Sequence, residues 1–193
     1  MATLEEIKTT NDPAIEGTDY DAVLTLLMNS IGTIFDDYCN RSFQANEFTE
    51  FHGANGEFIY LRNLPIREVV SIYADVEREF NEDDLMSSDR FQILGDGEDG
   101  VIYSPFFLYY PYKSIQITYS GGYDPIDVNG GSYPIPADLK MAFIRQVQSD
   151  FKRRRDLGML TVTFKDGSIT KPNVNELLPQ VMGTLDRYRW VNI

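Results

Sequence analysis

Carboxylates set between glycines are the side chains of this sequence whose spacing comes closest to a chemical site. Residues 95–100 read Gly-Asp-Gly-Glu-Asp-Gly, and carboxylate oxygens are the ligands that Ca²⁺ and Mn²⁺ prefer. The same glycines are what a tight connection between two strands requires. Two interpretations of this loop therefore stay open: a hairpin connection, which we favour, and the metal site of a small metal-dependent enzyme.

The other residues that could do chemistry lack partners at a working spacing. His52 and Cys39 are the single histidine and the single cysteine, so the chain has no thiolate cluster for zinc and no internal disulfide. The sequence contains no G-x-S-x-G, H-E-x-x-H or G-x-x-x-x-G-K-[ST] motif. The favoured prediction is a protein that is not an enzyme, with no catalytic residue, no metal ligand and no cofactor.

The charge of the chain excludes two classes of partner. Its 17 Lys and Arg against 30 Asp and Glu give a net charge of −13, whereas binding to nucleic acid by phosphate neutralisation, or to anionic lipid, needs a basic surface. Residues 1–100 carry 22 acidic and 6 basic side chains, and residues 101–193 carry 8 and 11. This polarity suits head-to-tail packing of identical subunits, although solvated acidic loops would produce the same counts.

No stretch of the sequence is apolar over the roughly 18 residues that a membrane-spanning helix needs. The chain also opens without the basic and apolar regions of a signal peptide. We therefore expect a soluble protein of cytoplasmic origin, with no membrane partner.

Two clusters could form contacts between subunits. One is a run of four cations at the end of a predicted helix, more than a helix C-terminus needs for its dipole, and we expect it to contact an acidic neighbour. The other is the segment 105–112, which holds five aromatic residues and would either fill a β core or form a tyrosine-rich interface. The candidate subunit-interface residues are Lys152, Arg153, Arg154, Arg155, Phe106, Phe107, Tyr109 and Tyr110.

The hydrophobic period changes along the chain. Helical spacing predicts helices over residues 4–10, 19–40, 136–157 and 179–190. Thr3 and Glu6 stand at capping-box spacing at the start of the first helix, and Asn40 suits a left-handed residue at the end of the second. The third has apolar residues four positions apart: Leu139, Phe143, Val147 and Phe151. In the second helix, the expected core stripe is Val23, Leu27, Ile31, Ile34, Phe35 and Tyr38, widened by Leu24, Met28 and Cys39. Alternating polarity predicts strands over residues 47–51, 57–61, 68–73, 91–94, 101–104 and 114–120, with hairpins at Asn55-Gly56 and at 95–100, and a short hairpin around Asp166-Gly167.

These elements predict an α+β fold, a bundle of two long and two short helices with an inserted small antiparallel β lobe. We expect residues 1–45 and 121–193 to form the helical body and residues 46–120 to form the β lobe.

Several segments form an ordered set of motifs. Residues 37–43 are a helix end followed by an aromatic residue, and residues 61–72 are close to the strand-pair pattern L-x-x-x-P-I-x-x-V-x-S-V. Residues 117–123, followed by 135–142, carry Y-x-G-G-Y and P-x-D-L-K-x-A, and the chain closes with Leu-Pro at 178–179 and Leu-Asp-Arg-Tyr-Arg at 185–189. In this order, the segments resemble the head-completion or head–tail connector adaptor proteins of tailed bacteriophages. The acidic loop at 75–89 and the aromatic segment lie outside the pattern.

The resemblance implies a homo-oligomeric ring, commonly of twelve copies, that docks beneath the portal protein after DNA packaging. The ring would extend the DNA channel, let DNA pass without sequence-specific binding, and provide the platform for a downstream stopper or tail-completion protein. The alternative within the same connector is that the chain is itself the stopper or tail-completion protein. The expected location is the virion, with the host cytoplasm during assembly.

Members of the family reach the portal with their C-terminal segment. The resemblance therefore implies portal-docking candidates at the matching positions here, and it assigns oligomerisation and portal docking to the helical body. These candidates are Leu185, Tyr188, Arg189 and Trp190.

Overall fold

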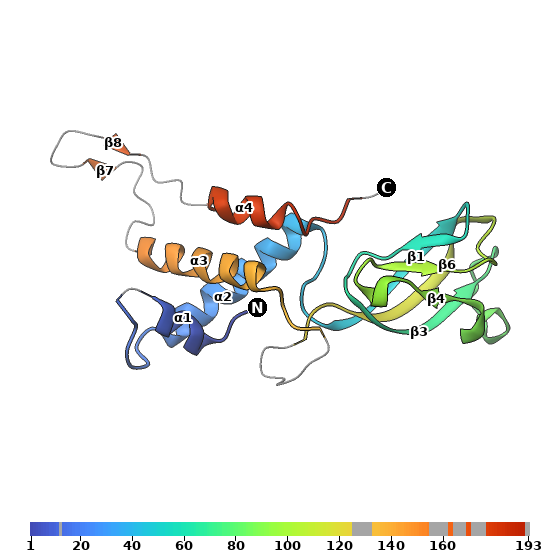
Figure 1. Ribbon diagram of the computed structural model, residues 1–193, viewed down its shortest axis with the longest axis horizontal. Coiled ribbons are helices and arrows are strands. Elements are labelled where there is room, and N and C mark those ends of the chain that lie inside the picture. The colour runs from blue at the N-terminus through green and yellow to red at the C-terminus, as the bar shows by residue number, and fades with distance from the viewer. Residues whose placement is uncertain (12, 125–132, 155–161, 164–168, 171–176, 192–193) are drawn as a thin grey trace. The chain divides into compact units, whose positions relative to one another are not determined.

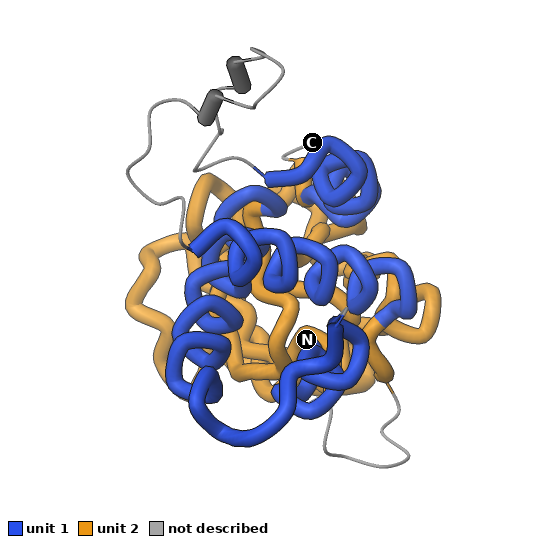
Figure 2. Tube along the Cα trace, turned by 90° about the vertical axis from the view of Figure 1, so that its left-hand side faces the viewer, with its two compact units in different colours: residues 1–39, 136–189 blue, residues 40–135, 190–193 orange. Residues whose placement is uncertain are grey.

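The computed structural model describes residues 1–11, 13–124, 133–154, 162–163, 169–170 and 177–191. It combines helices with antiparallel strands (Figure 1), which confirms the predicted α+β class. The chain divides into two compact units (Figure 2): unit 1 consists of residues 1–39 and 136–189, and unit 2 of residues 40–135 and 190–193. That a helical body and a β lobe fold as separate domains stays a prediction.

Unit 1 holds the α-helices of the described chain. They are α1 (Leu4–Thr10), α2 (Asp21–Cys39), α3 (Ala137–Arg153) and α4 (Pro179–Leu185). The short strands β7 (Val162–Thr163) and β8 (Ile169–Thr170) pair antiparallel, as the turn signal at Asp166-Gly167 predicts. No helix among the described residues is long and apolar enough to cross a membrane.

The ends of these helices follow local capping rules. At the start of α1, the Thr3 hydroxyl accepts a hydrogen bond from the Glu6 amide at 3.1 Å, and the Glu6 carboxylate accepts one from the Thr3 amide at 2.9 Å. Asn40 ends α2 with a φ of 54°, the left-handed conformation expected there. The last helix, α4, ends at Leu185 rather than at the predicted residue 190, because a turn over residues 186–188 follows it. In this turn, Asp186 bonds to Tyr38 of α2 and Tyr188 bonds to Asp138 of α3.

The core face of α2 differs from the expected stripe. Leu24, Ile31, Phe35 and Cys39 are buried, whereas Val23 and Ile34 are 41% and 43% exposed. The Phe35 ring meets Phe143 of α3 edge-on, with 5.7 Å between the centroids. The two apolar rows of α2 lie close together around the helix, so the period alone could not show which row α3 and α4 cover.

Unit 2 contains two three-stranded antiparallel sheets. The first has the order β1 (Asn46–Ala54), β6 (Tyr110–Gly121), β3 (Ile66–Ala74), and the second has the order β2 (Phe58–Tyr60), β5 (Val101–Tyr103), β4 (Gln92–Ile93). Three 3₁₀ turns, η1 (Glu82–Asp84), η2 (Ser88–Arg90) and η3 (Gly95–Gly97), lie in the connections. The predicted hairpin across residues 95–100 is confirmed, since it joins β4 to β5.

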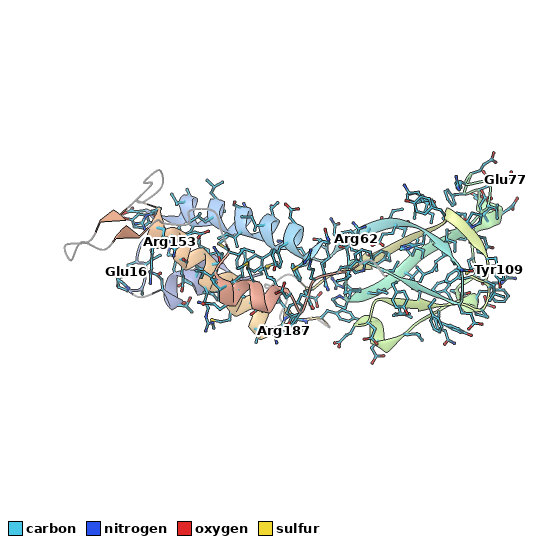
Figure 3. All side chains as sticks on the ribbon, turned by 90° about the horizontal axis from the view of Figure 1, so that it is seen from above. Glu16, Arg62, Glu77, Tyr109, Arg153 and Arg187 are labelled. Carbon is cyan, nitrogen blue, oxygen red and sulfur yellow. The ribbon has the colours of Figure 1, made fainter. Side chains whose placement is uncertain are left out.

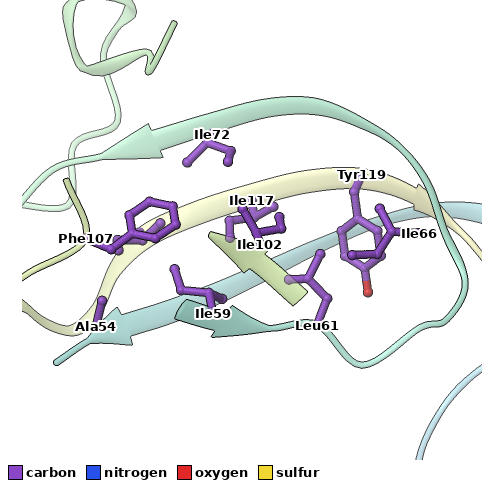
Figure 4. Close-up of a cluster of buried hydrophobic side chains, with 10 residues drawn as sticks. Ala54, Ile59, Leu61, Ile66, Ile72, Ile102, Phe107, Ile117 and Tyr119 are labelled. Atoms are coloured by element: carbon purple, nitrogen blue, oxygen red, sulfur yellow. The ribbon is translucent and has the colours of Figure 1, made fainter. Parts of the chain in front are cut away.

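Both sheets contribute to one hydrophobic core. Its buried members come from β1, β2, β3, β5 and β6 and from the segment before β6 (Figure 4): Ala54, Ile59, Leu61, Ile66, Ile72, Ile102, Phe107, Ile115, Ile117 and Tyr119. From Ile115 to Gly121 in β6 the buried residues alternate with half-buried ones, as expected for a central strand with one face on the core.

The predicted hairpin at Asn55-Gly56 is wrong. The strands on either side of this turn belong to different sheets, because β1 pairs with β6 and β2 pairs with β5. A side chain at Gly53 would lie 2.8 Å from the Pro111 carbonyl oxygen, so glycine lets β1 approach β6 where the register shifts. The pairing of β1 with β6 joins residues more than 50 positions apart in the chain, and a local turn signal carries no information about such distant partners.

Candidate functional site

In unit 2, backbone hydrogen bonds join segments that carry the motifs. The Tyr123 amide donates to the Phe43 carbonyl at 2.9 Å, and the Gly122 amide donates to the Pro65 carbonyl at 3.0 Å. Gly122 has a φ of +94°, and a Cβ there would lie 2.5 Å from the Gln44 carbonyl oxygen. The Gly-Gly pair of the motif therefore stands where three chain segments cross, in a conformation that favours glycine.

Arg41 lies within this crossing. Its guanidinium carbon is 5.0 Å from the centroid of the Phe43 ring and 5.9 Å from that of Tyr123, and these two rings stack on each other. One guanidinium nitrogen also donates to the Leu64 carbonyl. Because Arg41 is only 6% exposed, its charge orders the crossing rather than facing a partner.

In unit 1, the segment after α4 is bonded to the first turn of α3. The Tyr188 hydroxyl donates to Asp138 Oδ1 at 2.6 Å, and Arg187 Nη2 lies 2.9 Å from Asp138 Oδ2. The hydrogen bond from Tyr188 is the main cause of a lowered pKa of Asp138, and the Leu139 amide and the Arg187 charge add to it. Two of the motifs, D-L-K and D-R-Y-R, thus meet through their own side chains.

A second contact holds the same segment to the end of α2. The Tyr38 hydroxyl donates to Asp186 Oδ1 at 2.7 Å, and the Arg189 guanidinium lies 5.8 Å from the centroid of the Tyr38 ring. The bond to Asp186 is the main cause of a raised pKa of Tyr38. Both contacts are on the surface of unit 1, so they position the segment without burying it.

The four portal-docking candidates differ in exposure. Leu185 is fully buried and its carbonyl accepts a bond from Cys39 Sγ at 3.5 Å, so its side chain anchors α4 within unit 1. Tyr188 is half-buried and Arg189 is exposed. Trp190, which belongs to unit 2, is half-buried with the Arg62 guanidinium 5.1 Å from its ring centroid. A partner could reach Arg189 and one face of its two neighbours.

The cationic end of α3 combines exposed and fixed charges. Lys152 and Arg153 are exposed, and Figure 3 shows Arg153 at the end of unit 1 opposite Arg187. The Arg154 guanidinium carbon lies 3.8 Å from the centroid of the Phe151 ring, and Arg154 Nη1 donates to the Phe151 carbonyl at 2.6 Å. Arg155 lies outside the described residues.

The aromatic segment 105–112 is divided between the core and the surface of unit 2. Phe107 is fully buried in the core of unit 2, and Tyr110 packs against that core. Phe106 is 50% exposed beneath the Arg90 guanidinium, and Tyr109 is 84% exposed. Figure 3 shows Tyr109 and Glu77 at the same end of unit 2. Only the exposed members are available to a neighbouring subunit.

Sequence reasoning missed a buried polar network in unit 2. Glu50 accepts a hydrogen bond from the Tyr119 hydroxyl, lies 3.1 Å from His52 Nε2, and accepts one from the Arg62 amide at 3.2 Å. Burial alone would raise the pKa of Glu50, but the bonds from His52 and Tyr119 outweigh it and lower the pKa. The signal was available, since Phe48, Glu50 and His52 stand at every second position of β1 and therefore share its half-buried face.

The backbone conformation of the loop at 95–100 accounts for its glycines. Gly95, Gly97 and Gly100 have φ values of 61°, 85° and 67°, where glycine is the favoured residue. The part of the chain that the structure describes contains no group of three or more His, Cys, Asp or Glu side chains placed to hold a metal ion.

Comparison with known proteins gives one family. A sequence model described as HCP, head completion protein, matches residues 1–191. No curated protein matches the chain.

Solved structures with a similar fold come from gene transfer agent (GTA) particles. A chain in the neck of an empty GTA particle, computed with C6 symmetry, is 13% identical with a TM-score of 0.61, and the match covers 97% of this chain and 89% of that one. A chain in the neck of a native particle, computed with C12 symmetry, is 15% identical with a TM-score of 0.55, over 89% and 84% of the two chains. A chain in the native GTA virion is 16% identical with a TM-score of 0.56, over 92% and 81%. At identities this low, the TM-scores show a shared fold alone.

Proposed function

The chain belongs to the head completion protein family, and from that premise we propose that it forms a ring of identical subunits beneath the portal protein of a tailed, phage-type particle. Its family makes it a structural component of the virion's head–tail connector and not an enzyme, which removes the metal-dependent alternative. In this proposal the ring extends the DNA channel and offers the docking platform for the next connector or tail component. The observation that carries the proposal is the family match over residues 1–191.

Symmetry supports a closed ring. The similar GTA neck structures are computed with C6 and C12 symmetry, and we propose twelve copies for this protein. Unit 2 has 16 acidic and 6 basic residues and unit 1 has 14 and 11, so both units are net acidic. Attraction between subunits would therefore come from local clusters such as the cations at the end of α3, and head-to-tail contacts close into a ring when the rotation between subunits allows it.

The acidity of the chain supports passage of DNA without sequence-specific binding. A net charge of −13 repels phosphates, and binding that depends on phosphate neutralisation weakens when the wall of a channel is acidic. The cations at the end of α3 are few and clustered, which suits a contact between proteins better than a continuous basic track along DNA.

The C-terminal segment supports a portal-docking surface. Arg189 is exposed, and Tyr188 and Trp190 are half-buried, the first with its hydroxyl bonded to Asp138 and the second with the Arg62 guanidinium near its ring. Tryptophan, tyrosine and arginine are the residues that most often dominate the energy of protein–protein contacts. We propose that these three residues contact the portal and that Leu185 supports them from the core of unit 1.

Electron microscopy of portal complexes mixed with the purified protein tests the proposal. We expect a monomer or a weak oligomer in the free protein, and a ring beneath the portal after mixing. Portal complexes that carry no added ring would contradict the proposal. Co-purification with tail components but not with the portal would instead assign the stopper or tail-completion role.

A further inference from the structure

Unit 1 contains a hollow of about 440 Å³ beside the cationic end of α3. Its walls come from the chain between α1 and α2 and from the last turn of α3, and they include Asn11, Ile15, Glu16, Tyr20, Lys152 and Arg154. Figure 3 shows Glu16 and Arg153 at this same end of the unit.

The charge of the hollow favours an anionic occupant. Lys152 is exposed and forms no ion pair with any described residue. The Arg154 guanidinium is fixed between rings, 3.8 Å from the centroid of Phe151 and 4.9 Å from that of Tyr20. A cation fixed in this way pairs with a carboxylate without first losing side-chain freedom. Among the described residues of the lining, Glu16 is the one acidic residue.

Asn11 adds a polar side chain to the lining. It is 8% exposed, and its amide nitrogen donates to the Pro13 carbonyl at 2.7 Å. Its carbonyl oxygen Oδ1 is buried and has no hydrogen-bond partner among the described residues, which is unfavourable. A rotation of this amide toward a backbone N–H of an occupant would satisfy the oxygen, and a peptide segment supplies such N–H groups together with carboxylates for the cations.

Unit 2 presents a segment with this chemistry, residues 75–84, the first part of the stretch 75–89, and from here on this part is called the acidic loop. The Asp75 carboxylate accepts backbone hydrogen bonds from Glu77 at 2.8 Å, Glu79 at 2.6 Å and Phe80 at 3.2 Å, so the loop has a defined conformation. Four of its carboxylates are exposed: Glu77, Glu79, Glu82 and Asp83. A loop that is ordered in advance loses little freedom when it binds.

We propose that the hollow of one subunit receives the acidic loop of a second copy of this chain. The inference rests on the proposed ring, because it assigns one contact between neighbouring subunits. Charge complementarity selects the occupant: the loop carries six acidic residues and one basic residue, Arg78, while two of the three charged residues described in the lining are cations. A nucleic acid would need a continuous basic track, which two cations beside one hollow do not provide.

Cross-linking between two different variants tests this contact and retains every attractive charge. Glu16→Cys places a thiol at the hollow and removes its one acid, and Val76→Cys places a thiol on the loop, where Val76 is 58% exposed. Cys39 is fully buried and does not compete. After ring assembly on the portal, a short bis-maleimide reagent is added to the mixed variants and to each variant alone. We expect a covalent dimer from the mixture, at several times the yield of either variant alone.

A charge exchange then shows whether the contact is electrostatic. Lys152→Glu lowers the yield about three- to tenfold, and Glu79→Lys on the other variant restores it. Arg145→Glu is the matched control, since Arg145 is an exposed cation of α3 outside the hollow. If rings assemble but no cross-linked dimer forms, or if Lys152→Glu leaves the cross-linking yield unchanged, the inference is overturned and the proposed ring still stands. Absence of rings overturns both.

Discussion

The Tyr188 hydroxyl donates a hydrogen bond of 2.6 Å to Asp138 and so joins the turn after α4 to the first turn of α3. We expect Tyr188→Phe to lower the free energy of unfolding by about 0.5 kcal/mol, the low end for a hydrogen bond, because the Asp138 side chain is 38% exposed. Urea unfolding followed by circular dichroism measures the change.

The same bond has a pH dependence. The bond lowers the pKa of Asp138. Its contribution to the free energy of unfolding is therefore complete above the ordinary aspartate pKa of 3.8, and it is lost as the pH falls through the lowered pKa. The wild-type protein and the Tyr188→Phe variant should therefore become equally stable in strong acid. Tyr109→Phe is the control, since Tyr109 is 84% exposed, and an equal loss in that variant would show that the Asp138 bond is not the cause.

Glu50→Gln should destabilise unit 2 by about 1–3 kcal/mol near neutral pH, because an amide replaces the carboxylate that accepts hydrogen bonds from Tyr119 and the Arg62 amide. The bonds from His52 and Tyr119 outweigh burial and lower the pKa of Glu50, so the carboxylate stabilises the fold above its ordinary pKa of 4.5. The deficit of the variant should shrink as the pH falls below that value. Unfolding curves at several pH values check this, and a deficit independent of pH would contradict it.

Gly122→Ala should cost more than about 2 kcal/mol of stability. The substitution adds a Cβ at a φ of +94°, 2.5 Å from the Gln44 carbonyl oxygen, where neither backbone can yield without breaking the crossing. Gly32→Ala is the matched control, because Gly32 lies in α2 with nothing within 4 Å of its would-be Cβ. Alanine there should stabilise by about 0.5–1 kcal/mol. Equal thermal shifts in the two variants would refute the packing argument.

The sequence predicts features that depend on near neighbours in the chain. The capping box of Thr3 and Glu6, the left-handed Asn40 and the hairpin over 95–100 each follow from a few adjacent residues, and the structure contains all three. The apolar period of α3 likewise predicts its buried residues Leu139, Phe143, Val147 and Phe151.

Features that depend on distant segments were not predictable. The pairing of β1 with β6 depends on how much apolar surface each arrangement buries, which the signal at Asn55-Gly56 does not contain. Which of the two apolar rows of α2 is buried likewise depends on the helices α3 and α4 that pack against it. For the docking candidates, sequence similarity indicated the segment, but it could not show that Leu185 is buried while Arg189 is exposed.

The double substitution Arg189→Ala and Trp190→Ala should weaken attachment to the portal about thirtyfold or more, the loss typical of removing a dominant interface residue. Truncation after Arg187 should give a similar loss, but it also removes the bond between Tyr188 and Asp138, so the point variants separate docking from folding. Surface plasmon resonance on immobilised portal measures the affinity. Arg145→Ala, an exposed arginine on α3, controls for net charge; an equal loss there would argue against a specific docking surface.

Two residues of the aromatic segment 105–112 allow effects on folding to be separated from effects on assembly, because Phe107 is buried and Tyr109 is exposed. Phe107 is fully buried in the core of unit 2, so Phe107→Ala should cost about 3–5 kcal/mol of stability. Tyr109 is 84% exposed, so Tyr109→Ala should change stability by less than about 0.5 kcal/mol.

If the exposed part of the segment contacts a neighbouring subunit, Tyr109→Ala should still reduce ring occupancy on the portal, because an exposed tyrosine adds energy only when a partner buries it. Counting complete rings in electron micrographs at several protein concentrations measures this. Full occupancy at the wild-type concentration would remove Tyr109 from the subunit interface, and the contact would then depend on the hollow beside α3 and the acidic loop.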